Sequence, residues 1–312
     1  EAYLGLIALV ILNRRLNVGE TGGGVSVIMR YTLRLLTLQQ FQRASYLIMA
    51  LELMRRWNDA LGKEPITIGL WVGASSLPNR LDDLKSEIEK LLNNQGNNIP
   101  FQKCPWCGDG LKTYTNNSNN IFEKHRHNLS CINKKCSFYT ISLGQGPYQG
   151  CLPLNLCDES IYRHPPSLLF GTVDKFAQLA HKVAQEGDKD SRRLFGRGKW
   201  RNGKPNEGYL PPDLIIQDEL HLLLGPLGSA VGLFESAIDQ LCTQSDGTLP
   251  KIITSTATTR NTNLQIAGLF NRKVQIFPKP GVECDDTFFS FYKRHYDEND
   301  NEVFEAKRRY LG

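Results

Sequence analysis

Two apolar runs joined by one helical pattern constrain the fold of this chain most strongly. The first run is Leu214-Ile215-Ile216 and the second is Lys251-Ile252-Ile253-Thr254. Between them, the segment 228–244 repeats apolar residues at helical spacing, at Val231, Phe234, Ile238 and Leu241. Continuous apolar runs are typical of parallel strands covered on both faces, and a strand–helix–strand unit is a right-handed crossover in nearly every known case. The pattern predicts an α/β fold, with a parallel sheet flanked by helices.

Polar residues follow both runs at their carboxyl ends. Asp218-Glu219-Leu220-His221 comes after the first run, and the hydroxyl-rich segment 255–259 comes after the second. Ligands of open α/β sheets bind just beyond the carboxyl ends of the strands, so we expect both segments at one sheet edge. Acidic pairs are also common at solvated strand ends, where they need no catalytic role. In a nucleoside triphosphatase, the first carboxylate would hold Mg²⁺ and the second would take a proton from the attacking water.

The two polar segments resemble a pair of helicase motifs. Asp218-Glu219-Leu220-His221 followed by Ser255-Thr256-Ala257-Thr258 is similar to motifs II and III of superfamily 2 helicases, the DEAD/DEAH group. In the order expected of that family, 25–34 resembles motif Ia and 167–176 resembles motif Ic. The segments most similar to the helicase of DISARM phage-defence systems are 31–43, 171–177, and 217–222 with 225–228. The matching segments run from about residue 1 to about residue 283.

The resemblance implies the RecA-like first motor domain of a helicase that hydrolyses ATP, with Mg²⁺, to move on DNA. It gives catalytic roles to Asp218, Glu219 and His221, with Asp218 holding Mg²⁺ through water and Glu219 positioning the attacking water. It implies that nucleotide state is coupled to domain movement by Ser255, Thr256, Ala257 and Thr258. It also implies contacts with the nucleic-acid backbone, which carry little sequence specificity, by Arg30, Thr32, Arg34, Thr172 and Lys175. Other subunits of the defence system are the implied protein partners.

Two elements of that family are missing from these residues. A Gly-x-x-x-x-Gly-Lys-[Ser/Thr] phosphate loop is absent. Thr21-Gly22-Gly23-Gly24 is no substitute, because it precedes a strand pattern, whereas a phosphate loop follows a strand and opens a helix. The arginine motif of a second RecA-like domain is also absent, since 194–198 carries an arginine without the required context. We therefore expect an internal piece of a larger motor, beginning just after the phosphate loop.

Four cysteines in two close pairs carry the strongest local chemical signal. Two residues separate Cys104 from Cys107 and four separate Cys131 from Cys136, which is the spacing of structural zinc ligands. Four thiolates complete a tetrahedral shell and leave no open position for catalysis, so Zn²⁺ would stabilise the fold. A redox pair lacks a thioredoxin-like context, and a disulfide is unfavourable in a cytosolic helicase. The alternative ligands are His125 and His127.

The expected domain order is a RecA-like motor domain interrupted by a small zinc-binding insertion. The motor domain comprises 1–98 and 151–283, the insertion 99–150, and a linker toward a second RecA-like domain 284–312. The other predicted elements are helices over 1–15, 37–58, 77–93 and 174–184, and strands over 25–30, 66–72 and 167–172.

Composition indicates the class of protein and its compartment. The longest apolar stretch, 4–12, is far shorter than the roughly 18 residues of a membrane span, and a signal-peptide pattern is absent. We therefore expect a cytoplasmic protein without membrane contact. The net charge of +5 permits a nucleic-acid partner without requiring one. A basic segment over 186–208 with Trp200 either binds a phosphate backbone and stacks on bases or forms a solvated loop, and the arginines of 30–43 are either backbone contacts or helix surface.

Two other classes of function are compatible with these residues. A non-catalytic scaffold with a degenerate RecA-like domain would bind DNA or partner proteins, with a structural zinc module. A nuclease or signalling ATPase with a phosphate loop would use the same Asp218-Glu219 pair without a second RecA-like domain. The residues upstream distinguish the scaffold from the motor, because a Gly-Lys-Thr there would restore ATP hydrolysis.

Overall fold

A computed structural model gives the fold, and it describes residues 2–32, 34–114, 128–139, 151–177, 179, 190–197, 209–223, 225–256, 262–278, 288, 295–299 and 301–303. The chain divides into two compact units, 1–260 and 261–312. The predicted boundaries of the insertion lie inside the first unit and stay predictions.

One parallel sheet forms the centre of the first unit. Within the described residues it has six strands, in the order β5-β2-β6-β1-β7-β8, and every neighbouring pair is parallel. The strands are β1 (Val27–Tyr31), β2 (Ile68–Trp71), β5 (Leu154–Asn155), β6 (Leu168–Thr172), β7 (Leu214–Gln217) and β8 (Lys251–Thr254). The predicted α/β fold is confirmed, and the two apolar runs of the sequence are the neighbouring strands β7 and β8.

The central strands are buried on both faces, because their alternate side chains enter two different apolar clusters. Val27 and Leu214 belong to the larger cluster, whereas Ile28 and Ile215 belong to the smaller one. Successive side chains of a strand point to opposite faces of the sheet, so each cluster marks one face. Strands buried in this way have no polar face, which explains their continuous apolar sequence.

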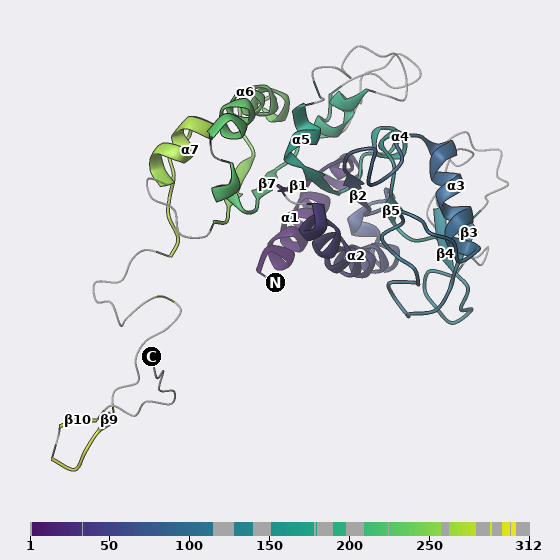
Figure 1. The fold of residues 1–312 in the computed structure, drawn as a ribbon, viewed down its shortest axis with the longest axis horizontal. Helices are drawn as coiled ribbons and strands as arrows, with labels where there is room; N and C mark the ends of the chain where they lie inside the picture. The colour runs from purple at the N-terminus through teal and green to yellow at the C-terminus, as the bar shows by residue number, and fades with distance from the viewer. Residues whose placement is uncertain are drawn as a thin grey trace. The chain divides into compact units, whose positions relative to one another are not determined.

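Helices cover both faces of the sheet (Figure 1). The larger cluster takes apolar residues from α1 (Ala2–Val18), α2 (Arg34–Trp57) and α3 (Leu81–Leu92). The smaller cluster takes them from α4 (Asp158–Arg163), α5 (Val173–Phe176), η4 (Ser191–Phe195) and α6 (Gly225–Cys242). The described residues also include the single turns η1 (Gly19–Gly22), η2 (Asp59–Leu61) and η5 (Leu220–Leu222).

The cysteine-rich region joins the core of the sheet instead of forming its own. It contains the antiparallel pair β3 (Leu111–Tyr114) and β4 (Asn128–Cys131), beside α3 (Figure 1). Phe101, Leu129 and Phe138 are buried in the same cluster as the residues under the larger face of the sheet. The region is therefore packed onto the first unit through apolar contacts.

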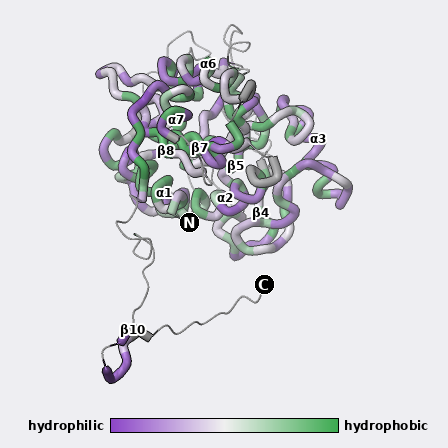
Figure 2. Tube along the Cα trace, turned by 60° about the vertical axis from the view of Figure 1, so that its left-hand side comes forward, coloured by the Kyte–Doolittle hydropathy of each residue, from purple (hydrophilic) through white to green (hydrophobic). Residues whose placement is uncertain are grey.

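The second unit contains the helix α7 (Thr262–Phe270) and the antiparallel pair β9 (His295–Tyr296) and β10 (Glu302–Val303). The β9–β10 segment is strongly hydrophilic (Figure 2). Its turn is closed by Asp297, whose Oδ1 accepts hydrogen bonds of 2.9 Å from the backbone N–H groups of Asn299 and Asn301. Among the residues that the structure describes, no helix has the length and apolar character needed to cross a bilayer.

Candidate functional site

Four central strands of the sheet end at the same level. Tyr31 of β1 lies opposite Thr172 of β6, and Gln217 of β7 lies between Arg30 and Thr254 of its neighbouring strands. The residues that follow these strands, among them Asp218 and Ser255, therefore meet at the carboxyl edge of the sheet. This is the edge at which open α/β sheets bind their ligands.

Asp218 and Ser255 are in direct contact at this edge. The Ser255 hydroxyl donates a hydrogen bond to Oδ1 of Asp218. The backbone holds the pair in place, because the Ser255 N–H donates to the Gln217 carbonyl at 3.0 Å and the Leu220 N–H donates to the Ser255 carbonyl at 2.9 Å. The segment after β7 and the segment after β8 are thus linked by both side-chain and backbone hydrogen bonds.

Glu219 adopts a backbone conformation that is rare for a residue with a side chain. Its φ is 54° and its ψ is 46°, in the left-handed region. Such a conformation is strained, and it persists when the surrounding structure imposes it. Here Leu220, which is fully buried, fixes the chain on one side, and the Glu219 N–H donates to Asp218 Oδ1 at 3.1 Å on the other. The turn directs the Glu219 carboxylate away from the core.

The Glu219 side chain is 35% exposed and lies beside His221. Nδ1 of His221 is 3.3 Å from Oε2 of Glu219. One oxygen of the carboxylate is therefore oriented by the imidazole while the side chain remains open to water. A carboxylate held in this way can position a water molecule and accept its proton.

Three polar atoms at or beside this edge have no hydrogen-bond partner within the part of the chain that the structure describes. They are Oγ1 of Thr32, Oγ1 of Thr172 and Oε1 of Gln217. Buried polar groups are nearly always paired, so unpaired ones require an explanation. Gln217 does use its Nε2, which donates to the Asp218 carbonyl at 2.9 Å. A polar ligand at the edge would satisfy the remaining atoms.

Tyr31 was not singled out by the sequence, although it lies close to the acidic pair. Burial and the nearby Asp218 carboxylate raise the pKa of Tyr31, so its hydroxyl stays protonated. The ring stacks on Phe170 with centroids 5.8 Å apart. Its position at the end of β1, opposite Thr172, is set by strand register, and that register is not visible in the sequence.

Arg30 and Lys175, two of the predicted nucleic-acid contacts, are instead buried in ion pairs. Both Arg30 terminal nitrogens donate to Glu235 of α6, and the two side chains are 1% and 2% exposed. Lys175 Nζ lies 2.9 Å from Oδ2 of Asp158, with side chains 1% and 6% exposed. Arg30 joins β1 to α6, whereas Lys175 joins α5 to α4 and donates to the Val72 carbonyl at 3.1 Å. Their geometry gives no support to a contact with a nucleic-acid backbone.

The other predicted residues differ in how far the structure describes them. Thr256 is exposed, and Arg34 is the first residue of α2. Ala257, Thr258, His125, His127 and most of 186–208 lie outside the described residues.

The four predicted zinc ligands come together in one cluster. The sulfur atoms of Cys104, Cys107, Cys131 and Cys136 all lie within 4.8 Å of one another. The Cys107–Cys131 separation is 3.4 Å and the Cys104–Cys136 separation is 4.0 Å. A tetrahedral zinc site with Zn–S bonds of about 2.3 Å places its sulfurs roughly 3.8 Å apart. The cluster therefore has the size of a Cys₄ zinc site, and its sulfurs are too far apart for a disulfide.

Local backbone geometry forms each half of the cluster. The Cys104 knuckle turns at Gly108, whose φ of 82° favours glycine, and the Gly108 N–H donates to the Cys104 carbonyl at 2.9 Å. In the second half, the Asn133 N–H lies 3.3 Å from the Cys131 sulfur. Burial raises the pKa of Cys136 to about 11, so in the absence of a cation this thiol would stay protonated at neutral pH. A bound cation would reverse that preference.

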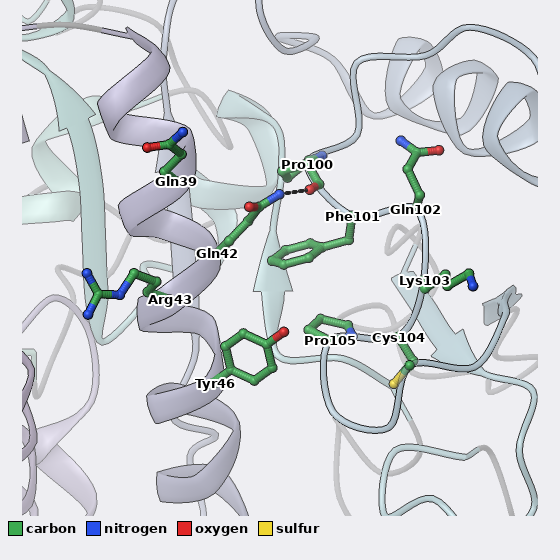
Figure 3. A pocket seen from close by; sticks show the side chains of 11 residues that line it. Gln39, Gln42, Arg43, Tyr46, Pro100, Phe101, Gln102, Lys103, Cys104 and Pro105 are labelled. Carbon is green, nitrogen blue, oxygen red and sulfur yellow. Dashed lines mark hydrogen bonds between the residues drawn. The ribbon is translucent and has the colours of Figure 1, made fainter.

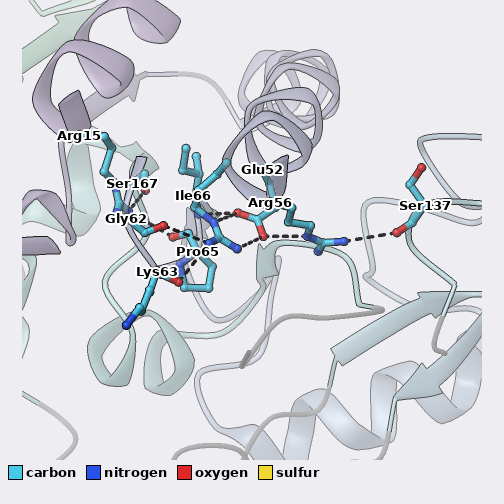
Figure 4. A network of polar contacts seen from close by, with 10 residues as sticks. Arg15, Glu52, Arg56, Gly62, Lys63, Pro65, Ile66, Ser137 and Ser167 are labelled. Atoms are coloured by element: carbon cyan, nitrogen blue, oxygen red, sulfur yellow. Dashed lines mark hydrogen bonds and ion pairs between the residues drawn. The ribbon is translucent and has the colours of Figure 1, made fainter. Parts of the chain in front are cut away.

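A buried carboxylate connects this cluster to the sheet (Figure 4). Glu52 of α2 is fully buried and accepts hydrogen bonds from Arg55, from Arg56 and from the backbone N–H of Ile66. Arg56 also donates to the Ser137 carbonyl at 3.3 Å and lies over the Phe138 ring at 5.2 Å. Residues just after the last cysteine are thereby attached to α2 and, through Ile66, to the chain entering β2.

Comparison with known proteins relates this chain to a defence protein. It is 36% identical over 338 residues to the DISARM protein DrmA of Bacillus paralicheniformis. The alignment covers 96% of this chain and 29% of that protein, so the chain spans less than a third of the length of its relative. The resemblance predicted from the sequence is confirmed. No protein-family model matches the chain.

Solved helicase structures show only a weak likeness. The DUF1998 helicase MrfA bound to DNA and AMPPNP has a TM-score of 0.30 at 13% identity, covering 86% of this chain and 28% of its own. MrfA bound to DNA alone has a TM-score of 0.29 at 14% identity, covering 85% of this chain and 25% of its own.

Proposed function

We propose that this chain forms part of the first RecA-like motor domain of an ATP-dependent DNA helicase or translocase, in a DISARM-like defence system acting in the cytoplasm. The observation that carries the proposal is the contact between Ser255 and Asp218 at the carboxyl edge of the sheet, with the Glu219 carboxylate beside it. The similarity to DrmA supports the defence role. Other subunits of such a system are its proposed protein partners.

The residues of the edge divide the work of ATP hydrolysis. Asp218 offers a carboxylate oxygen, the ligand type that Mg²⁺ prefers, and would hold the ion through water. Bound Mg²⁺ would supply positive charge to the phosphates of ATP. Glu219 is open to water and would orient the attacking molecule and accept its proton. His221 keeps the Glu219 carboxylate in one orientation.

Ser255 would couple the state of the bound nucleotide to the position of the segment after β8. Its hydroxyl contacts Asp218, while its backbone carbonyl holds Leu220. A change in the charge around Asp218 would therefore act directly on the segment after β8. Thr256, Ala257 and Thr258 belong to the same proposed coupling segment.

The unpaired hydroxyls of Thr32 and Thr172 are the proposed contacts with the DNA backbone at this edge. Both follow or end central strands, and hydroxyl groups bind phosphate oxygens without reading the base sequence. The contact of Arg34 with the DNA backbone stays a prediction. Arg30 and Lys175 are proposed to act beneath these residues, where they position β1 and α5.

The cysteine cluster is proposed to hold one structural Zn²⁺. Its four sulfurs match the ligand number and spacing of a closed site, with no position left for a reacting molecule. When bound, the ion would stabilise the four thiolates and join the two halves of the insertion.

The test is ATP turnover by the full-length protein, with and without DNA, for the wild type and Glu219→Gln. Removing a general base lowers turnover by about a hundredfold or more, so DNA-stimulated turnover should fall by that factor in the variant. Glu89→Gln, an exposed change on α3, is the matched control and should keep wild-type turnover. Equal turnover in Glu219→Gln and wild type, or absent turnover in both, would reject the motor and favour the non-catalytic scaffold.

A further inference from the structure

A pocket separates α2 from the first cysteine knuckle (Figure 3). Its volume is about 590 Å³. Gln42 and Tyr46 point from α2 across the gap toward the segment 100–105, as Figure 3 shows. The Gln42 side chain spans this gap and donates a hydrogen bond to the Pro100 carbonyl, so it links the two walls.

Tyr46 gives the pocket an aromatic wall that the fold does not require. The side chain is 50% exposed, whereas Phe41 on the same helix is fully buried. Phe101, which is 6% exposed, and Pro105 lie across the gap from α2. An exposed aromatic face opposite apolar groups is the arrangement on which an unpaired base can stack.

The rim of the pocket is basic. Arg43 and Lys103 are both lining residues, and none of the residues that line the pocket is acidic. Figure 3 shows Arg43 and Lys103 pointing away from the gap, one on each side. A base inside the pocket would thus have a cation on each side for the phosphates of its backbone.

Arg43 also connects the pocket with the carboxyl edge of the sheet. The positive charge of Arg43 acts on Tyr31 and opposes the rise in its pKa caused by burial and by Asp218. Tyr31 immediately precedes Thr32, a proposed contact with the DNA backbone. The charge of Arg43 therefore acts on a residue of this edge as well as lying at the rim of the pocket.

We propose that this pocket binds an unpaired base of single-stranded DNA, stacked on Tyr46, with the adjoining phosphates held by Lys103 and Arg43. The exposed Gln39 amide offers a donor and an acceptor to the base edge. Cys104 lines the same pocket and belongs to the cysteine cluster. Zinc would therefore fix one wall of a DNA subsite. The proposal rests on DNA being the substrate of the motor.

The test measures equilibrium binding of fluorescein-labelled oligothymidylate to the full-length protein, without ATP. Tyr46→Ala should raise Kd about tenfold, because a stacking partner is lost. Tyr46→Phe keeps the aromatic ring and should bind the oligonucleotide with the Kd of wild type. Trp57→Ala is the matched control, since Trp57 is 81% exposed about three turns further along α2 and does not line the pocket.

Lys103→Ala provides a second, electrostatic readout. Loss of the Lys103 charge should reduce the slope of the logarithm of the association constant against the logarithm of salt concentration. The expected reduction is about 0.7, the contribution of one phosphate contact on a single strand. A Kd for Tyr46→Ala equal to that of wild type, or no binding of the oligonucleotide by wild type, would overturn the subsite and favour a protein segment as its occupant. ATP turnover is absent from these measurements, so a failed motor and a failed subsite give different results.

Discussion

The carboxyl edge of the sheet and the cysteine cluster are both built from a few polar side chains. The cluster has a complete set of ligand atoms, whereas the edge retains polar atoms without partners among the described residues. In the cluster, four sulfurs face one another within 4.8 Å. At the edge, Thr32, Thr172 and Gln217 retain unpaired polar atoms among the described residues, and Glu219 is held in a strained conformation. A complete ligand set suits an ion that stays, whereas an incomplete set suits a ligand that binds and leaves.

The two regions should therefore respond differently to mutation. Changes in the cysteine cluster should lower the free energy of unfolding, because a permanent ion is part of the fold. Changes at the exposed part of the sheet edge should lower turnover with little effect on the free energy of unfolding.

The largest expected effect is the loss of zinc in Cys131→Ser. Cys131 is fully buried in the cluster, and structural zinc contributes on the order of 10 kcal/mol in small zinc peptides. The free energy of unfolding should fall by several kcal/mol, with faster hydrogen exchange in β3 and β4. Cys242→Ser changes a buried cysteine outside the cluster and should retain one zinc per chain. A full zinc content in Cys131→Ser would contradict a four-cysteine site.

Breaking the ion pair beneath the sheet edge should have the next largest effect. Glu235→Ala leaves Arg30 buried without its partner, which costs about 3–5 kcal/mol of the free energy of unfolding. The double variant Arg30→Met, Glu235→Leu removes both charges and should recover most of that loss, measured by chemical denaturation. It should also bind DNA as wild type does, and weaker binding would restore Arg30 as a DNA contact.

Ser255→Ala removes the hydrogen bond that links Asp218, at the sheet edge, to the segment after β8. A hydrogen bond to a charged group contributes about 1.5–3 kcal/mol, so loss of the Ser255–Asp218 contact should lower ATP turnover by roughly tenfold or more. Ser86→Ala, the same change at an exposed position on α3, should have little effect. Equal turnover in the two variants would show that the contact does not serve catalysis.

The smallest expected effect is a gain of stability in Glu219→Gly. Glycine adopts the left-handed conformation freely, so the free energy of unfolding should rise by about 1 kcal/mol and Tm by roughly 2–4 °C, while turnover is lost with the carboxylate. Asn94→Gly relieves a second positive φ, far along the chain from the edge, and should leave turnover unchanged. A lower Tm in Glu219→Gly would mean that the Glu219 side chain stabilises the turn.

The sequence predicts those features that depend on local pattern. Strands β7 and β8 are visible because both faces of the sheet are covered, so their residues form continuous apolar runs. The cysteine cluster is visible because the spacing within each pair matches the reach of a knuckle around one ion. The meeting of Asp218 and Ser255 follows from the parallel pairing of these strands.

The sequence does not show which residues pair with a buried cation, because the partners belong to different elements of the fold. Arg30 lies in a basic segment that resembles a DNA-contacting motif, yet its partner Glu235 is 205 residues away. The partner of Lys175, Asp158, is much nearer in the chain but belongs to a different helix, α4. The pocket at Tyr46 also escapes sequence analysis, because its walls come from α2 and from the separate segment 100–105.

The core shared by the sheet and the cysteine-rich region limits how the two can change during evolution. Phe101 packs against Phe41 of α2, and Phe41 packs in turn against Phe170 of β6. A substitution at one of these positions therefore changes the fit of the others. Replacing the cysteine-rich region with that of a relative would require compensating changes in the core that it packs against. We therefore expect its apolar residues and those of the sheet to vary together in evolution.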